Sequence, residues 1–482
     1  MEGCKLKIAR DELDLFLSSI SQPNIPSPQV LDATPALIGS STTEAYRCKC
    51  SFQIIADDDI TDNLVCVIRE NGTICHLPDG IFPPANLKIR EAMKSLINLL
   101  NKRSDVVDKD THKMHTFNRL RENLTSVTFD TSWNEAECLV TLHYGPPGIS
   151  QSCCKEWKQE AQIVCDECQF VRVTGRSKGI KIFVTGSTYT ALIAAADDSI
   201  LEEGIIHDTI WLTLQKSPID DDKRLHRVKS VSLVQSEQST VALNVQIQYQ
   251  KPATAFQHPN AGVMITSLHW ILNTLSKIAE EHNITTGLSD TESTKLRLLE
   301  MYNGAGAHTL PLAKSMLLSE IVAVELDKRL VDACRNNCRL NNCLKGEEES
   351  DQDQTLVEVL KGDAAEWAAK TLRCIKKKNR LSEDTTANEI SSNRTNDYNE
   401  FDILLVDPPR QGLDTTVCEM AIKGTFSDLI YISCGRRALL RDLKLLCTSF
   451  DIEDLAVIDL FPGTDAVETL IRLKRKRNNI TT

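Results

Sequence analysis

The sequence lacks any apolar run long enough to cross a membrane. No stretch of about 18 or more apolar residues occurs in its 482 residues, so we expect no transmembrane helix. Glycine and proline are scarce, with 20 and 16 residues, which excludes a collagen-like or low-complexity chain. Hydrophobic residues make up 41% and charged residues 25%, which is typical of a globular protein that buries a sizeable core.

An excess of positive charge is missing too. The chain has 55 Lys and Arg against 67 Asp and Glu, a net charge of −12. This charge argues against a protein that binds polyanions over its whole surface. Positive charge is nevertheless clustered in RLKRKR at 472–477, so a local basic groove is compatible with the sequence.

A secretory leader is not apparent. The N-terminal residues MEGCKLKIARDELDLF contain no apolar core and carry early acidic residues, unlike signal or transit peptides. The 17 cysteines are an odd number at low density, which indicates free thiols in a reducing compartment. We therefore expect a cytoplasmic protein, with an organelle as the alternative. We predict no metal site; the alternative is a metal held by four thiols, those of Cys153, Cys154, Cys165 and Cys168.

The pattern of the chain changes twice, which predicts three regions. Residues 1–45 are polar with scattered Pro and Ser, and we expect a flexible lead-in. Residues 46–255 show alternating strand patterns closed by Asn-Gly and Asp-Gly and an amphipathic helix at 86–104, which indicates an α+β region. In 256–482, short apolar strands alternate with helices, which is typical of an α/β, doubly wound, Rossmann-like sheet. The polar residues 375–400 are predicted to be a disordered insertion.

A glycine-containing turn follows the first strand of the C-terminal region. In LLEMYNGAGAHTL, Gly304 and Gly306 allow the backbone to approach a ligand at the carboxyl end of the sheet. The next strand ends in Glu325, whose carboxylate can accept hydrogen bonds from a ribose diol. The third glycine of a dinucleotide turn is absent, and Asp363 follows a later strand where it can contact an adenine amino group. The pattern favours S-adenosylmethionine over a dinucleotide; a tight turn and a helix-capping Glu325 are the alternatives.

Two further strand ends carry acidic residues. The strand in FDILLVDPPRQGLD ends in two prolines, which fix the backbone and direct Asp407 and Arg410 towards the same crevice. The alternative is a proline-terminated strand with a capping aspartate. The turn in FPGTDAVE adds Asp465 and Glu468 at another sheet end, with a plain surface turn as the alternative.

A cysteine at a strand-to-helix junction is the candidate nucleophile. In LIYISCGRRALL, Cys434 ends an apolar strand. The following helix N-terminus and the adjacent Arg436 and Arg437 are expected to lower the pKa of its thiol. A buried structural cysteine is the alternative.

Taken in order, these motifs resemble the S-adenosylmethionine-dependent RNA (uracil-5-)-methyltransferase family, whose members make 5-methyluridine in tRNA or rRNA. The matching segments are LLEMYNGAGAHTL, DPPRQGLD, YISCGRR and FPGTDAVE, and the resemblance covers residues 256–473. It implies a Rossmann-like enzyme domain, an RNA partner, no membrane, a monomer, and an N-terminal region that helps to hold the RNA. The sequence departs from the family pattern at five places. His258 stands where the family has Gln, Asn303 where it has Cys, and Ala307 where it has a polar residue. Gly435-Arg436 stands in place of Asn-Pro, and Ala466 in place of His.

The resemblance also implies roles for individual residues. Cys434 would be the nucleophile that adds to C6 of the uracil, and Glu468 the base that removes the C5 proton. Asp407 would hydrogen-bond the uracil edge and touch the cofactor. The residues expected to bind S-adenosylmethionine are His258, Tyr302, Gly304, Gly306, Ala307, Glu325, Asp363 and Asp407.

Two other functions are also compatible with the sequence. One is a decayed methyltransferase fold that serves as an RNA-binding or assembly protein, and the other is a methyltransferase for a different base. Retention of both Cys434 and Glu468 favours uridine methylation, because methylation of an amino group needs no covalent nucleophile.

Overall fold

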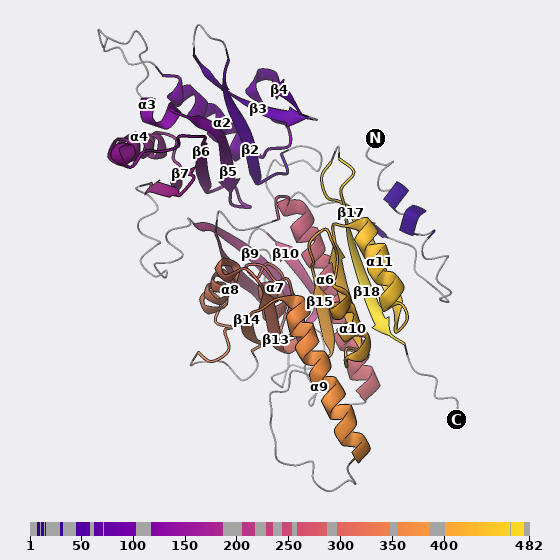
Figure 1. The fold of residues 1–482 in the computed structure, drawn as a ribbon. Coiled ribbons are helices and arrows are strands. Elements are labelled where there is room, and N and C mark those ends of the chain that lie inside the picture. The colour runs from indigo at the N-terminus through magenta and orange to yellow at the C-terminus, as the bar shows by residue number, and fades with distance from the viewer. Residues whose placement is uncertain are drawn as a thin grey trace, which may run out of the picture. The chain divides into compact units, whose positions relative to one another are not determined.

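The chain forms two compact units in a computed structural model. Unit 1 consists of Met1–Thr34, Thr209–Tyr249 and Val263–Thr482, and unit 2 of Pro35–Asp208 and Gln250–Gly262. Figure 1 follows the chain through its elements. The residues that the structure describes are 7–9, 11–13, 15, 29–31, 45–57, 62–70, 72–102, 117–186, 205–216, 228–234, 243–252, 258–286, 296–347, 354–384, 401–462 and 464–476.

Unit 1 is built on an eight-stranded sheet. Its strands are β1 (Gln29–Leu31), β12 (Leu296–Met301), β13 (Leu318–Glu325), β14 (Leu356–Lys361), β15 (Ile403–Val406), β16 (Asp428–Ser433), β17 (Phe450–Asp459) and β18 (Val467–Arg475). They lie in the order β1-β17-β18-β16-β15-β12-β13-β14. The strands from β16 to β14 in this order are parallel, whereas β18 is antiparallel to both β16 and β17. The expected α/β, doubly wound, Rossmann-like fold is confirmed.

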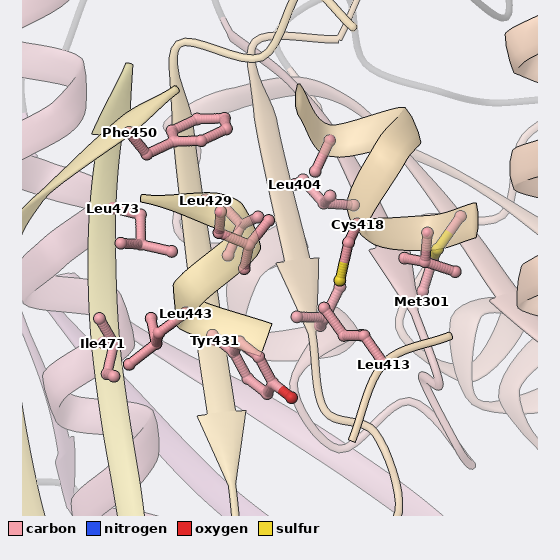
Figure 2. Close-up of a cluster of buried hydrophobic side chains, with 14 of the residues drawn as sticks. Met301, Leu404, Leu413, Cys418, Leu429, Tyr431, Leu443, Phe450, Ile471 and Leu473 are labelled. Atoms are coloured by element: carbon pink, nitrogen blue, oxygen red, sulfur yellow. The ribbon is translucent and has the colours of Figure 1, made fainter. Parts of the chain in front are cut away.

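Helices connect these strands and cover the sheet. They are α6 (Ala261–Thr286), α7 (Thr309–Lys314), α8 (Lys328–Leu340), α9 (Ala364–Asp384), α10 (Thr415–Lys423) and α11 (Arg436–Leu446). Helix α10 contacts both α9 and α11, and one cluster of buried side chains joins these three helices to the sheet. Figure 2 shows part of this cluster, with Leu404 and Leu429 from the strands, Cys418 from α10 and Leu443 from α11. Helices on a parallel sheet require strands that are apolar throughout, as ILLV in β15 is.

A three-stranded sheet spans the division between the units. It consists of β9 (Ile205–Lys216), β10 (Val228–Val234) and β11 (Leu243–Pro252) in the order β10-β9-β11. Residues 209–249 belong to unit 1 and residues 250–262 to unit 2, so the predicted boundary at 255/256 does not coincide with this division. The alternating pattern of these strands indicates their type, but it does not indicate which core they join.

Unit 2 is built on a seven-stranded sheet in the order β4-β3-β2-β5-β6-β7-β8. All pairs are antiparallel except β6 and β7, which are parallel. The predicted helix at 86–104 is present and presents Ile89, Met93 and Leu96 to the core. The elements are β2 (Lys49–Ala56), β3 (Leu64–Glu70), β4 (Thr73–His76), η1 (Pro78–Gly80), α2 (Leu87–Leu100), α3 (Asn118–Arg121), β5 (Leu124–Thr131), β6 (Cys138–Tyr144), η2 (Gln151–Cys153), α4 (Cys154–Glu167), β7 (Arg172–Ser177) and β8 (Ile180–Thr185).

Two segments that we expected to be unstructured are partly ordered. Within 1–45, Ala9 and Leu13 are fully buried in the core of unit 1, and β1 pairs in parallel with β17. Helix α9 extends to Asp384, so the first part of the predicted insertion is helical. That part is rich in Lys and Arg, which are good helix formers. The rest of 1–45 that is not described, and residues 385–400, lie outside the described residues.

Neither a membrane helix nor a metal cluster is found in the described parts of the chain. No helix there combines the length and the apolarity needed to cross a bilayer. No three His, Cys, Asp or Glu side chains in the same ranges are grouped as metal ligands. Of the four cysteines in the alternative metal site, Cys165 is buried in the core of unit 2 and its thiol donates to the Phe170 carbonyl at 3.0 Å.

Candidate active site

The strand order of the unit 1 sheet reverses between two central strands. The chain order reverses between β12 and β15, because β13 and β14 lie on one side of β12 and β16 lies on the far side of β15. Met301 and Val406 are the last paired residues of β12 and β15, so Tyr302 and Asp407 leave the sheet side by side. The Asp407 amide donates to the Met301 carbonyl at 3.4 Å. Open α/β sheets bind their ligands at such a reversal.

The turn after β12 has a backbone that favours glycine. Gly304 and Gly306 have φ angles of +60° and +90°, and Tyr302 also lies in the left-handed region at 65°. A Cβ on Gly306 would lie 2.9 Å from Sγ of Cys334, whereas a Cβ on Gly304 would meet nothing within 4 Å. Gly306 is therefore required for packing, and Gly304 borders open space in which a ligand can lie against the backbone.

Acidic residues at the next strand ends hold this turn and the helix after it. Oε2 of Glu325 accepts a hydrogen bond from the Gly304 amide at 3.0 Å, and its Oε1 accepts one from the Asp327 amide at 2.8 Å. Oδ1 of Asp363 accepts from two amides in the first turn of α9, at 2.9 and 3.0 Å. The carbonyl of Ala307 accepts from a tyrosine hydroxyl of β11 at 3.0 Å. The turn is thus fixed by unit 1 itself.

Glu300 lies beneath this turn and was not predicted as a site residue. It is 1% exposed on β12, and its Oε2 accepts from the Thr309 hydroxyl at 2.7 Å, while Nδ1 of His308 lies 4.0 Å from Oε1. Burial raises the pKa of Glu300 to about 8, and the charges of Asp407 and Glu325 act in the same direction. The side chain is therefore a neutral acid at pH 7. The only signal in the sequence is one acidic residue within an apolar strand.

Strand register brings the three predicted catalytic residues to one place. Ser433 of β16 pairs with Thr469 of β18, so Cys434 and Glu468 adjoin this pair at the same end of the sheet. Asp407 continues β15, which pairs in parallel with β16. Burial is the largest cause of the raised pKa of the Cys434 thiol, and both carboxylates add to it, as expected for groups that lie close together.

Asp407 and Glu468 form a coupled pair of carboxyl groups. Burial raises the pKa of Asp407 to about 7. Burial also raises the pKa of Glu468 well above its usual value, and repulsion by the Asp407 charge adds to the effect. Glu468 is only 4% exposed. Two neighbouring carboxyl groups with little solvent cannot both ionise readily, so the pair retains a proton at neutral pH.

The thiol of Cys434 is harder to ionise than the sequence predicted. Desolvation raises its pKa, the two neighbouring carboxylates add to the shift, and the Arg410 charge opposes it. The expectation that Arg436 and Arg437 lower this pKa is therefore wrong. Arg436 is engaged with Glu12, whose Oε2 lies 2.8 Å from its Nε. The cation that acts on the thiol belongs to the loop after β15, which precedes Cys434 by more than twenty positions in the sequence.

Cys434 opens into a pocket with a volume of about 270 Å³. Three of its lining residues are arginines and one is an aspartate, so the pocket carries net positive charge and suits an anionic substrate. It is one basic surface on a chain of net charge −12. The lining residues are Arg410, Cys434, Gly435, Arg436, Arg437, Ala438, Asp465, Ala466 and Val467.

His258 is the one predicted cofactor residue that belongs to unit 2. It is partly buried, and its Nδ1 lies 2.8 Å from the Asn260 carbonyl oxygen. Desolvation lowers the pKa of His258 to about 4, so the ring is neutral at pH 7. The other cofactor candidates all lie in unit 1, where Gly304 and Glu325 are in direct contact.

Comparison with known proteins shows a family to which this chain is similar. Residues 229–476 match the family model described as tRNA (Uracil-5-)-methyltransferase, just over half of the chain. A tRNA/tmRNA (uracil-C(5))-methyltransferase of Pseudoalteromonas atlantica is 25% identical over 437 residues, which are 91% of this chain and 90% of that protein. The protein of the same description from Cellvibrio japonicus is 30% identical over 229 residues, 48% of this chain and 51% of the relative.

A solved structure supports the fold. It is the tRNA (uracil-54, C5)-methyltransferase of Pyrococcus abyssi in complex with S-adenosyl-L-homocysteine. Its TM-score is 0.52 at 15% identity, with 98% of this chain and 83% of that chain covered. The match to the family model includes the glycine turn and the strand ends that carry Asp407, Cys434 and Glu468. The resemblance drawn from the motifs is thereby confirmed: the chain belongs to the tRNA (uracil-5-)-methyltransferase family and is an S-adenosylmethionine-dependent methyltransferase.

Proposed function

We propose that this protein methylates C5 of a uridine in tRNA, with Cys434 as covalent nucleophile and Glu468 as base. The observation that carries the proposal is the β16–β18 register, which sets Cys434 and Glu468 at adjoining strand ends with Asp407 on the next strand. tRNA is chosen over rRNA because the curated relatives are named for tRNA or tmRNA. The target base leaves the RNA stack to reach the pocket.

The reaction needs a nucleophile because C5 of uracil does not attack a methyl group unaided. Addition of the Cys434 thiolate to C6 forms an S–C6 bond and moves the electron pair of the C5–C6 double bond into an enolate. C5 then takes the methyl group. Glu468 removes the proton from C5, the pair returns to the C5–C6 bond, and the thiolate leaves. S-adenosylmethionine, when bound, supplies the methyl group on a sulfonium sulfur.

The proton shared by Asp407 and Glu468 suits this sequence of steps. Glu468 must be ionised to take the C5 proton, so the proton that the buried pair retains must lie on Asp407 at that step. A protonated Asp407 can donate a hydrogen bond to a uracil carbonyl oxygen, where the enolate charge develops. The pair thus offers a base and a donor at the same strand ends, and which oxygen holds the proton depends on the step.

For the methyl donor, we propose a cradle around the glycine turn. The open space beside Gly304 fits a ligand that lies against the backbone. Glu325 at the rim can accept from ribose hydroxyls, and the acidic character of this edge favours a cationic ligand. The proposed cradle comprises Tyr302, Gly304, Gly306, Ala307, Glu325, Asp363 and Asp407, all of which belong to unit 1.

We also propose that unit 2 helps to hold the RNA. Its β7–β8 hairpin carries the exposed Arg176, near the end of β7, and the exposed Lys178, in the turn. Burial lowers the pKa of the nearby His143, and the Arg176 charge adds to the effect. Replacing Arg176 and Lys178 with alanine should weaken tRNA binding and make it less sensitive to salt, by about one released counterion for each phosphate that these side chains neutralise. Lys94→Ala, on the exposed side of α2, is the matched control. Equal effects of both changes would contradict a role specific to the β7–β8 hairpin.

The covalent step can be tested directly by trapping. Glu468→Gln, incubated with tRNA and S-adenosylmethionine, should accumulate a protein–RNA adduct that survives denaturing electrophoresis. Cys434→Ala should form no adduct and no 5-methyluridine, whereas the control Cys374→Ala, at an exposed position, should behave as the unmodified protein. RNA that contains 5-fluorouridine should trap the unmodified enzyme, because fluorine does not leave as a proton does.

Three results would contradict the proposal. Near-normal methylation by Cys434→Ala would require another nucleophile. An active enzyme that forms no adduct in Glu468→Gln or with 5-fluorouridine would require another reaction. RNA binding without methylation by the unmodified protein would favour the decayed fold.

A further inference from the structure

Asp442 is a buried carboxylate to which the proposed chemistry gives no role. It lies on α11 and is 1% exposed. Its Oδ2 accepts from the Leu413 amide at 2.8 Å and from the Tyr431 hydroxyl at 2.7 Å. Its Oδ1 accepts from Nε and Nη2 of Arg441, at 2.8 and 2.7 Å. Figure 2 shows Tyr431 and Leu413 at the same end of the buried cluster. One carboxylate thus joins α11, β16 and the loop after β15.

The loop after β15 is fastened to α11 at further points. Nη2 of Arg441 donates to the carbonyls of Gln411 at 2.9 Å and Leu413 at 3.0 Å. Gly412 has a φ angle of +78°, and a Cβ at this position would lie 2.5 Å from Oδ2 of Asp442. Gly412 therefore lets the loop lie closer to α11 than a residue with a Cβ would at this position.

Gly435 allows a second close approach, directly beside the nucleophile. Its backbone angles, φ −117° and ψ 75°, do not require glycine. A Cβ there would overlap the carbonyl group of Arg410, whose carbon would lie 2.9 Å away. Glycine at this position therefore leaves room for the Arg410 backbone. Arg410 and Cys434 line the same pocket.

We propose that Asp442 and Gly435 are positioning residues that hold the Arg410 guanidinium beside the Cys434 thiolate. Asp442 fixes residues 411–413 to α11, and Gly435 admits the backbone of Arg410, so the cation stays at the pocket. A nearby cation favours the ionised thiol over the neutral one, in opposition to the effect of burial. The inference rests on the proposed role of Cys434.

The test measures the alkylation of Cys434 by iodoacetamide in the full chain, without RNA, as a function of pH. Below the pKa of the thiol, the alkylation rate follows the fraction of thiolate. Arg410→Gln removes the cation and should lower the rate near neutral pH by about tenfold, which corresponds to about one unit of pKa. Peptide mass spectrometry reads Cys434, and the exposed Cys374 serves as an internal reference whose rate should not change.

The positioning residues should act through Arg410. Asp442→Asn keeps the shape of the side chain but turns an amide donor towards either Arg441 or the Leu413 amide, so the loop loses part of its anchor. We expect a severalfold decrease in Cys434 alkylation for Asp442→Asn, and a similar decrease for Gly435→Ala. On an Arg410→Gln background, neither change should lower the rate further.

Three outcomes would overturn the proposal. The first is an unchanged rate in a folded Asp442→Asn protein. The second is an equal further decrease in the double variant with Arg410→Gln, which would indicate a general structural effect. The third is an unchanged rate in Arg410→Gln itself. If Asp442→Asn does not fold, Tyr431→Phe, which removes one donor and no charge, replaces it alongside Gly435→Ala. Methylation and adduct assays on Cys434→Ala report on the nucleophile separately, so either idea can fail alone.

Discussion

Two buried cysteines of unit 2 contrast with Cys434 of unit 1 in their surroundings. In unit 2, Cys50 and Cys66 face the core from β2 and β3, and burial raises the pKa of each to about 12. In unit 1, Cys434 is only partly buried at a strand end and opens into a pocket. There, Arg410 opposes the effects of burial and of two carboxylates on its pKa. Burial alone yields an inert thiol, whereas access and charged neighbours make a thiol that chemistry can use.

The largest expected effect comes from replacing a cysteine of each kind with alanine. Cys434→Ala should lower the methylation rate by at least about a thousandfold while leaving the unfolding transition in place, because a nucleophile contributes to the reaction and little to the core. Cys66→Ala should lower the free energy of unfolding by about 1 kcal/mol and leave the rate nearly unchanged. Methylation assays and thermal unfolding of both variants measure the contrast. A loss of activity in Cys66→Ala without loss of stability would contradict this contrast between the two cysteines.

A second contrast concerns glycines that lie in close contact with their neighbours. Gly306→Ala places a Cβ on a backbone with φ +90° and 2.9 Å from Cys334, so the turn must move. We expect S-adenosylmethionine to bind at least about tenfold more weakly by calorimetry. Gly175→Ala in unit 2 crowds Trp157, Ile149 and Ile182, which should destabilise the fold by about 1–3 kcal/mol and leave cofactor affinity unchanged. Equal losses of affinity in both variants would show that the turn is not the binding element.

A third contrast concerns the partners of two buried acidic side chains. Asp208 of unit 2 is paired with Lys251, whereas Glu300 of unit 1 is held by the neutral Thr309 hydroxyl. The pKa of Glu300 is raised from 4.5 to about 8 on folding. Between these pH values the folded chain keeps a proton that the unfolded chain has released. The free energy of unfolding therefore falls as the pH rises, by on the order of 1 kcal/mol per pH unit from this group.

Glu300→Gln removes that titration, because an amide does not ionise in this range. Urea unfolding at several pH values between about 5 and 8 should show a shallower decline in stability for the variant than for the unmodified protein. Thr371→Ser, on α9, is a control that leaves the slope in place. If the slopes of Glu300→Gln and the unmodified protein coincided, Glu300 would already be ionised in the folded state.

The smallest effect is expected for the ion pair between Glu12, near the N-terminus, and Arg436 of the pocket. The Glu12–Arg436 pair is well exposed on the Glu12 side, with 46% of that side chain accessible. Glu12→Gln should change the free energy of unfolding by no more than about 0.5 kcal/mol. The methylation rate should stay within about twofold. A larger increase in rate at low salt would show that Glu12 competes with RNA phosphates for Arg436.

The strand ends of the active site could be predicted from the sequence because each is marked locally. Glycines follow β12, prolines follow β15, and an apolar strand precedes Cys434. Parallel strands place their carboxyl ends at one edge of a sheet, so the motifs predict which residues share that edge. The sign of the charge effect on Cys434 was not predictable. It depends on which arginine lies near the thiol, and Arg410 is brought there by the fold rather than by neighbouring sequence.

Residues that act through burial and long-range pairing carry no local signal in the sequence. Asp442 resembles an ordinary helix residue until its partners in β16 and the loop after β15 are known. The three residues of β1 carry too little pattern to predict pairing with β17. The strands of 209–249 show their type through alternation, but membership of unit 1 follows from contacts such as the Gln248–Asn341 hydrogen bonds.

The pairing of β1 with β17 has a consequence for synthesis of the chain. Unit 1 is assembled from three segments, and most of unit 2 lies between the first two. A ribosome therefore makes β1 roughly 420 residues before its partner β17, a wait of about 20–80 s at typical elongation rates. Most of unit 2 leaves the ribosome during that interval and can begin to collapse. The eight-stranded sheet, which contains both β1 and β18, is completed last, when β17 and β18 emerge.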